Sequence, residues 1–181
     1  MKRPHQPLYT GILLCLSLIA FQSCNAPRQV IGTANGNKAP EIQAPDMQGK
    51  MLTLSALKGS YVLVEFWDSG NTTARENHME MQRMYKKYKD AAFKEGDGFC
   101  IFSVSLDKDK NQWIEAIQND QITWPCQVND FKAWFTPSAL AYDISFVPQY
   151  YLVDGNGNII RKNIMINQLA SILEDELQGR L

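Results

Sequence analysis

The sequence predicts an α/β fold in which helices flank a central mixed β-sheet, with a β-hairpin extension on its N-terminal side. Two nearly continuous apolar runs, 61–67 and 99–106, are typical of strands buried on both faces of a parallel sheet. Each run is followed by a segment whose apolar residues have helical spacing. Near the C-terminus, Asp154 to Gly157 (DGNG) separates two β-forming stretches and indicates a hairpin, which adds antiparallel strands.

The expected elements follow from turn residues and apolar periodicity. Asp46 to Lys50 is a turn signal, and Gly59 ends a brief turn that Ser55 can cap. Asn167 to Gln178 carries a helical apolar stripe. The predicted order is strand 51–54, turn 55–58, strand 61–67, helix 72–93, strand 99–106, helix 109–120, strand 124–128, helix 137–142, strands 149–153 and 158–161, and helix 167–178.

Length and composition favour one domain of ordinary size. The chain has 181 residues, of which 45% are hydrophobic and 20% charged, with a formal net charge of −1. This composition excludes a wholly disordered chain. It also lacks the basic field that binding to nucleic acid requires, so no nucleic-acid partner is expected.

The N-terminus predicts a lipoprotein signal peptide over residues 1–23. A basic start, Met1 to Arg3, precedes an apolar run, 11–21, that is too short to span a bilayer. Ser23-Cys24 at the end of this run resembles a bacterial lipobox, which implies that Cys24 is lipidated and becomes the first mature residue. The protein would then be held on the membrane of the bacterial envelope, facing the periplasm. The alternative is an ordinary secretory signal with Cys24 merely near the cleavage site.

Removal of the signal peptide changes the net charge and the number of cysteines in the mature chain. Without Lys2 and Arg3, 16 basic and 19 acidic side chains remain, a net charge of −3. Residues 24–38, rich in Asn, Gly and Ala, predict a flexible tether, and 39–181 form the domain. Cys100 and Cys126 are then the two remaining cysteines, in an oxidising compartment.

Several motifs of the domain resemble thioredoxin-fold thiol–disulfide oxidoreductases of the membrane-tethered TlpA/ResA type, within the redoxin (AhpC/TSA-like) group. The resemblance runs over residues 39–178, and the peroxiredoxins are the nearest neighbouring family. It implies a thioredoxin-like fold and a role in cell redox homeostasis. The motifs that carry it are Ala39-Pro40, Leu54 to Gly59, Val62 to Trp67, Phe146-Val147-Pro148 and Asp154 to Gly157.

The cysteine pair of that family is missing here. The resemblance places its two cysteines at Asn71 and Ala74, and no cysteine lies between Cys24 and Cys100. A helix N-terminus favours the attacking thiolate, and the second thiol resolves the mixed disulfide. Asn and Ala can do neither, so dithiol exchange at this site is excluded. Either Asn71 or Thr72 is instead predicted to be the N-cap of the following helix.

Other parts of the family's site remain. The resemblance makes Glu65 a buried carboxylate, which either acts as an acid or base or reaches polar groups or water at the end of the sheet. It makes Pro148 the cis-proline, and the preceding Val147 the residue whose backbone contacts extended peptide. Trp67 and the loop to Asn71 are expected to line the same groove, so peptide binding could survive the loss of redox chemistry.

The remaining thiols and methionines allow two interpretations each. Cys100 and Cys126 lie near the starts of two strands that a right-handed crossover would place side by side. They form either a structural disulfide or two separate buried thiols. His78, Met81 and Met84 step along one helix and suggest Cu(I), but the two methionines also belong to the core stripe. The core interpretation is favoured, and no metal or cofactor is expected.

The sequence therefore predicts an envelope-anchored, redox-inactive module that binds an extended peptide or an envelope protein, rather than an enzyme. The alternative is a thiol–disulfide oxidoreductase that uses Cys100 or Cys126.

Overall fold

The computed structural model describes residues 29–178. The signal peptide and Cys24 lie outside the described residues. Among the helices of residues 29–178, none has both the length and the apolar character needed to cross a bilayer.

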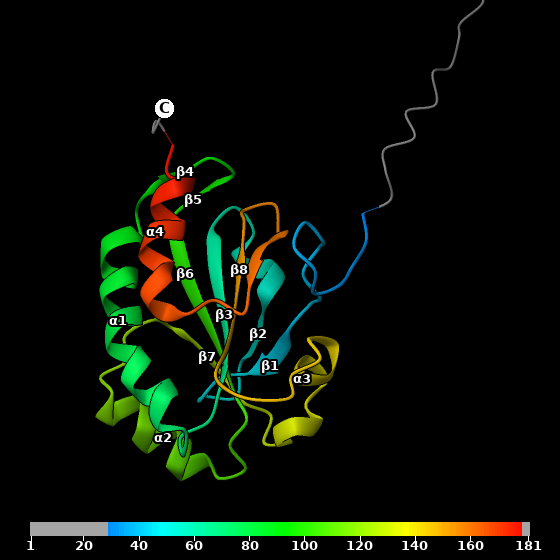
Figure 1. Cartoon of the computed structure of the whole chain (residues 1–181). Coiled ribbons are helices and arrows are strands. Elements are labelled where there is room, and N and C mark those ends of the chain that lie inside the picture. Colours follow the sequence, from blue (N-terminus) through cyan, green and yellow to red (C-terminus); the bar gives the residue numbers. More distant parts are fainter. Residues whose placement is uncertain (1–28, 179–181) are drawn as a thin grey trace, which may run out of the picture.

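A five-stranded mixed sheet forms the centre of the molecule (Figure 1). Its strand order is β7-β6-β3-β8-β9. The central strand β3 runs parallel to β6, which runs parallel to β7, and β8 and β9 add antiparallel strands. The predicted mixed sheet and its hairpin are therefore confirmed. The strands are β3 (Tyr61–Trp67), β6 (Phe99–Ser105), β7 (Cys126–Val128), β8 (Gln149–Val153) and β9 (Ile159–Lys162).

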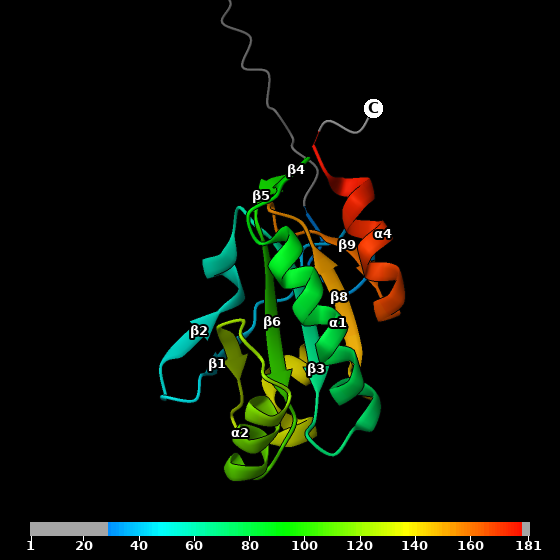
Figure 2. The same cartoon turned by 90° about the vertical axis from the view of Figure 1, so that its left-hand side faces the viewer.

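Helices α1 (Thr72–Tyr88) and α4 (Ile166–Glu176) cover one face of the sheet, as Figures 1 and 2 show. Met81 and Met84 of α1 pack with Leu169 and Leu173 of α4 in a single apolar cluster. Helix α2 (Lys110–Asn119) buries Trp113, Ala116 and Ile117 in a smaller cluster with Trp67 and Ala74. This layer therefore fixes the start of α1 against the end of β3.

The opposite face is covered by the predicted N-terminal hairpin, β1 (Gln43–Pro45) and β2 (Met51–Thr53). The short helices η1 (Leu54–Leu57), η2 (Ala133–Phe135) and α3 (Pro137–Ala141) follow on this side or near it. Ile42, Leu54 and Tyr142 pack there against Val62 and Val153 of the sheet.

Helix α1 is shorter than the predicted helix 72–93. It ends at Tyr88, and the chain then forms the two-residue strands β4 (Ala92–Phe93) and β5 (Gly96–Asp97). Phe93 stacks on Tyr61 with ring centroids 4.4 Å apart. Gly98, at a φ of 81°, donates its backbone N–H to Ala91 and closes the turn. Ala92 and Phe93 thus belong to a short hairpin whose Phe93 packs on Tyr61, which helical spacing alone did not reveal.

The predicted tether is ordered over its second half. Residues 30–38 form a turn in which Lys38 bridges both Ile31 and Asn158. The backbone N–H groups of Gly36 and Ala39 donate to the carbonyls of Ile159 and Gly157, respectively. The blue segment in Figure 1 therefore lies beside the β8–β9 turn. The expectation of a flexible tether is wrong for these residues, because their backbone hydrogen bonds are satisfied by the hairpin.

Candidate functional site

Asn71 lies where β3 has ended and α1 begins, and its side chain joins two segments. Its Oδ1 accepts the backbone N–H of Ala74 at 2.9 Å, which makes Asn71 the predicted N-cap of α1. Its Nδ2 donates to the backbone carbonyl of Val147 at 2.9 Å. The Val147–Pro148 peptide bond is cis, as expected. The amide of Asn71 thus ties the start of the helix to the cis-proline loop.

A groove of about 490 Å³ runs beside this loop. Pro148 and Tyr150 form one wall, Thr73 and Asn77 of α1 another, and the segment 164–167 a third. Phe146 and Met165 line it while 56% and 59% exposed. This groove therefore presents apolar side chains to solvent.

Trp67 does not line the groove, contrary to expectation. It is fully buried beneath α1, packing with Ala74 and Trp113. The side chain points to the helix-covered face of the sheet because residues along a strand alternate between faces. Asn71 is half-buried and Thr72 is exposed, so the loop itself remains accessible.

Glu65 is fully buried on the same face as Trp67 and has several polar neighbours. Its Oε2 accepts the hydroxyl of Ser103 at 2.6 Å, and that hydroxyl accepts the indole N–H of Trp124 at 2.9 Å. Glu65 therefore contacts polar side chains of the sheet. These contacts hold one carboxylate oxygen firmly and leave Oε1 for a further partner.

That partner is His78, which is 1% exposed. Its Nε2 lies 3.3 Å from Oε1 of Glu65, an ion pair outside good hydrogen-bond alignment. Its Nδ1 lies 2.6 Å from Oδ2 of Asp120. Arg75 then holds Asp120 through two guanidinium hydrogen bonds of 2.5 and 2.6 Å. Charges alternate along Glu65, His78, Asp120 and Arg75, which we call the buried charge chain.

Neighbouring charges within the buried charge chain favour the protonated form of His78 and the ionised form of Asp120. Burial alone would lower the pKa of His78, but the carboxylates of Glu65 and Asp120 outweigh it and raise the pKa above its ordinary value. Burial would raise the pKa of Asp120, but hydrogen bonds from Arg75 and His78 bring it below the usual range. His78 thus lies between two carboxylates that favour its protonated form.

The charge chain continues across the sheet as a row of polar side chains. Ser103 pairs with Glu65 on one side and with Gln127 on the other, and Tyr150 pairs with Glu65 from β8. The Tyr150 hydroxyl accepts from Asn77 at 3.0 Å. Since Asn77 and Tyr150 both line the groove and Asp120 lies between α1 and α2, polar groups connect the two sides of α1.

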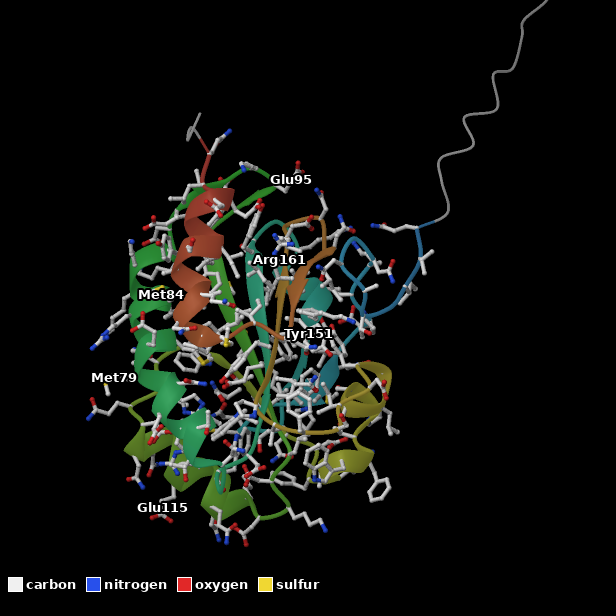
Figure 3. The ribbon with its side chains drawn as sticks, in the orientation of Figure 1. Met79, Met84, Glu95, Glu115, Tyr151 and Arg161 are labelled. Atoms are coloured by element: carbon white, nitrogen blue, oxygen red, sulfur yellow. The ribbon has the colours of Figure 1, made fainter. Side chains whose placement is uncertain are left out.

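Sequence reasoning did not place His78 beside Glu65. A signal was present, because His78 follows Ala74 by four residues and precedes Met81 by three, so all three share the buried face of α1. Met81 and Met84 pack in the apolar cluster, which supports the core interpretation of the methionines. Figure 3 shows Met79 on the outer side of α1, away from the core. Within residues 29–178, no group of His, Cys, Asp and Glu forms a metal-binding cluster.

Cys100 and Cys126 are free thiols, so the disulfide considered above is absent. The register explains this, because Cys126 pairs with Phe102, two residues beyond Cys100. That offset places the two Cα atoms about 8 Å apart on ordinary strand spacing, farther than a disulfide spans. Burial raises the pKa of Cys100 and, with Cys100 nearby, that of Cys126 to about 11. Both thiols are therefore poor nucleophiles at neutral pH.

Known proteins resemble this chain in sequence as well as in fold. The family model described as AhpC/TSA family matches residues 35–162. The chain belongs to the AhpC/TSA family. The thiol-disulfide oxidoreductase ResA of Bacillus subtilis is 24% identical over 156 residues, covering 84% of this chain and 80% of that protein.

Solved structures of similar proteins have the same fold. A thiol:disulfide interchange protein from Bacteroides sp. is 32% identical with a TM-score of 0.72, covering 81% of this chain and 92% of the other. The thioredoxin domain of a thiol-disulfide oxidoreductase from Bacteroides vulgatus is 32% identical with a TM-score of 0.70, covering 78% and 96%. This AhpC/TSA chain is therefore a thioredoxin-like protein whose relatives are thiol–disulfide oxidoreductases of the ResA type.

Asn71→Ala is expected to destabilise the AhpC/TSA domain by about 1–3 kcal/mol, because it removes both an N-cap and the hydrogen bond to Val147. Urea unfolding followed by circular dichroism measures this loss. Thr72→Ala is the matched control, since Thr72 is exposed and is not the N-cap. Asn71→Asp keeps the cap and should retain part of the stability. Equal stability of the Asn71→Ala and Thr72→Ala variants would show that Asn71 does not hold the loop.

Proposed function

We propose that this protein is a redox-inactive member of its family that binds an extended peptide or protein segment in the groove beside Pro148. Asn71 carries the proposal. A side chain that caps α1 and bonds the Val147 carbonyl occupies the position that the family resemblance gives to the attacking cysteine. It has no thiol to exchange, and its contacts stabilise the fold.

The groove supports binding through side chains. Its walls combine the exposed rings and chains of Phe146 and Met165 with the amide of Asn77. Burying such apolar surface contributes about 25 cal/mol per Å². The Val147 carbonyl already accepts from Asn71, so an extended segment would gain less from backbone pairing there than from apolar side chains. The ligand class is therefore an extended segment with apolar residues.

The alternative, an oxidoreductase that uses Cys100 or Cys126, is less well supported. Cys100 pairs with Val62, five residues before Trp67, and so lies about 16 Å along the sheet from the groove end. Both thiols have raised pKa values and are half-buried. A substrate disulfide in the groove would not meet them.

We also propose that the chain is an envelope lipoprotein anchored through Cys24 and facing the periplasm, on the strength of the lipobox-like Ser23-Cys24 that ends a short apolar run. Its signal peptide would be removed at residue 23. Intact mass spectrometry of the membrane-extracted protein tests this, and an unmodified Cys24 would contradict it.

The proposed function predicts that the purified protein does not reduce insulin above background, yet selects apolar peptides from a displayed library. Phe146→Asp should weaken the selected peptides at least about tenfold, because it places a charge in the apolar wall. Phe135→Asp is the matched control, since Phe135 is 78% exposed and does not line the groove. Insulin turnover that disappears in the Cys100→Ser, Cys126→Ser double variant would establish the alternative instead.

A further inference from the structure

A second hollow lies at the other end of the sheet, where the N-terminal segment, η1 and the β8–β9 turn meet. Its volume is about 110 Å³. Val62 and Val153, cross-strand neighbours on β3 and β8, form its floor, and Ala39, Leu54 and Leu57 form its walls. Lys58 lies at its rim, so we call it the Lys58 cavity. Figure 1 shows the N-terminal segment and the β8–β9 turn side by side here.

The inner surface of the Lys58 cavity is apolar. Val62 and Val153 are each 2% exposed, whereas Ala39 and Leu57 remain only half-covered by the fold. Water in such a site lacks the two to four polar partners that hold buried water. An apolar cavity of about 150 Å³ in another protein stays dry and takes up benzene. The Lys58 cavity is therefore suited to a small apolar group.

The charged side chains around the rim of the Lys58 cavity differ in whether they make hydrogen bonds. Both carboxylates do. Oε1 of Glu41 accepts the backbone N–H groups of Ile42 and Ser55, both at 3.1 Å. Oδ1 of Asp154 accepts the backbone N–H of Asn158 at 2.7 Å.

The two rim lysines differ in the same way. The ammonium of Lys38 donates to the carbonyl of Asn156. Lys58 is exposed, and its ammonium has no side-chain partner within residues 29–178. Within residues 29–178 the rim thus presents one unpaired cation, Lys58, beside the carboxylates of Glu41 and Asp154 and above an apolar interior.

We propose that the Lys58 cavity binds an amphipathic monocarboxylate, with its aliphatic tail on Val62 and Val153 and its carboxylate on the Lys58 ammonium. At roughly 30 Å³ for each methylene, about that of a water molecule, the volume holds about four methylene groups. The best tail is therefore that of pentanoate. This site stands apart from the peptide groove and does not depend on the proposed function.

The experiment is a titration of the purified chain with straight-chain carboxylates from acetate to octanoate, followed by ¹⁵N–¹H NMR. Saturable shifts are expected at the amides of Val62 and Val153. Affinity should rise about fourfold per methylene up to pentanoate and then level off. Pentan-1-ol should bind about fivefold more weakly, because it loses the charge pairing with Lys58, and pentylamine more weakly still, because its ammonium is repelled by Lys58.

Four variants locate the site. Lys58→Gln should weaken pentanoate about fivefold, whereas Lys50→Gln, outside the cavity, should not. Leu57→Trp should abolish binding by filling the cavity, whereas Ala56→Trp, on the same turn but outside the lining, should leave it intact. If Leu57→Trp fails to fold, Leu57→Ala replaces it and should move the best chain length beyond pentanoate.

Three results would overturn the proposal. The first is the absence of saturable shifts at any chain length. The second is equal binding of pentanoate and pentan-1-ol, which would show that Lys58 takes no part. The third is pentanoate binding that survives Leu57→Trp, or a best length unchanged by Leu57→Ala.

Discussion

Replacing His78 by leucine is expected to lower the free energy of unfolding at pH 6 by about 3–5 kcal/mol, because Glu65 would keep a buried charge without its counter-ion. Asp120 also loses its contact with the imidazole ring, although Arg75 continues to hold that carboxylate. Chemical denaturation monitored by tryptophan fluorescence measures the loss.

The same substitution should change how stability depends on pH. The pKa of His78 is raised in the folded state, so its contribution is fully present below the unfolded value of about 6.5 and is lost as pH rises through the folded pKa. The pKa of Asp120 is lowered, so its contribution is present above about 3.9 and is lost as pH falls through the folded pKa. The wild type should therefore be most stable between these limits. His78→Leu should remove the loss of stability that the wild type shows as pH rises through the folded pKa of His78.

A double variant separates the ion pair from simple packing. Glu65→Leu combined with His78→Leu removes both charges and should recover most of the stability lost in His78→Leu, since an apolar pair of similar volume is often neutral or stabilising. Arg83→Leu is the control, because its exposed pairing with Glu80 contributes less than about 1 kcal/mol. If the double variant is no more stable than His78→Leu, the contribution of His78 is not its charge.

The second large effect is a gain of activity. Asn71→Cys with Ala74→Cys, in a Cys100→Ser, Cys126→Ser background, is expected to raise insulin reduction more than about tenfold above the wild type. A thiol at the N-terminus of α1 would lie in the field that lowers a thiol pKa from about 8.5 toward 7, which raises its thiolate fraction at neutral pH up to about fifteenfold. Ala74 is fully buried beside Trp67, where a resolving thiol would be shielded.

The controls test position rather than composition. Asn71→Cys alone should form mixed disulfides but not turn over, because no second thiol resolves them. Glu76→Cys with Met79→Cys places the same spacing on the exposed middle of α1, away from the helix N-terminus, and should stay at background. Failure of the Asn71, Ala74 pair despite formation of its disulfide would show that the scaffold has lost more than its cysteines.

The larger part of the fold follows from sequence pattern. β3 and β8 coincide with the predicted strands, because continuous apolar runs bounded by turn residues leave little choice. The end of α1 was misplaced, since Ala92 and Phe93 continue the helical spacing but form strand β4, from which Phe93 packs on Tyr61. The local spacing of apolar residues does not show against which part of the folded protein each of them packs.

The candidate site, like the fold, was predicted in part. Asn71, Val147 and Pro148 meet as the resemblance implied, because the order of motifs fixes which loops converge. The pairing of Glu65 with His78 was missed, since it depends on the rotation of α1 against the sheet. The face of the sheet to which Trp67 points could have been predicted from strand alternation, because it is the face of Glu65 and Leu63.

The docking of residues 30–38 on the β8–β9 turn determines how the domain is presented. Lys38 bridges Asn158 just beyond the end of β8, whereas Pro148 immediately precedes its start, about 17 Å away along the strand. Any attachment made upstream of Gln29 therefore pulls on one end of β8 while the groove opens at the other. In the proposed envelope-anchored protein, β8 would therefore separate the groove from the point of attachment.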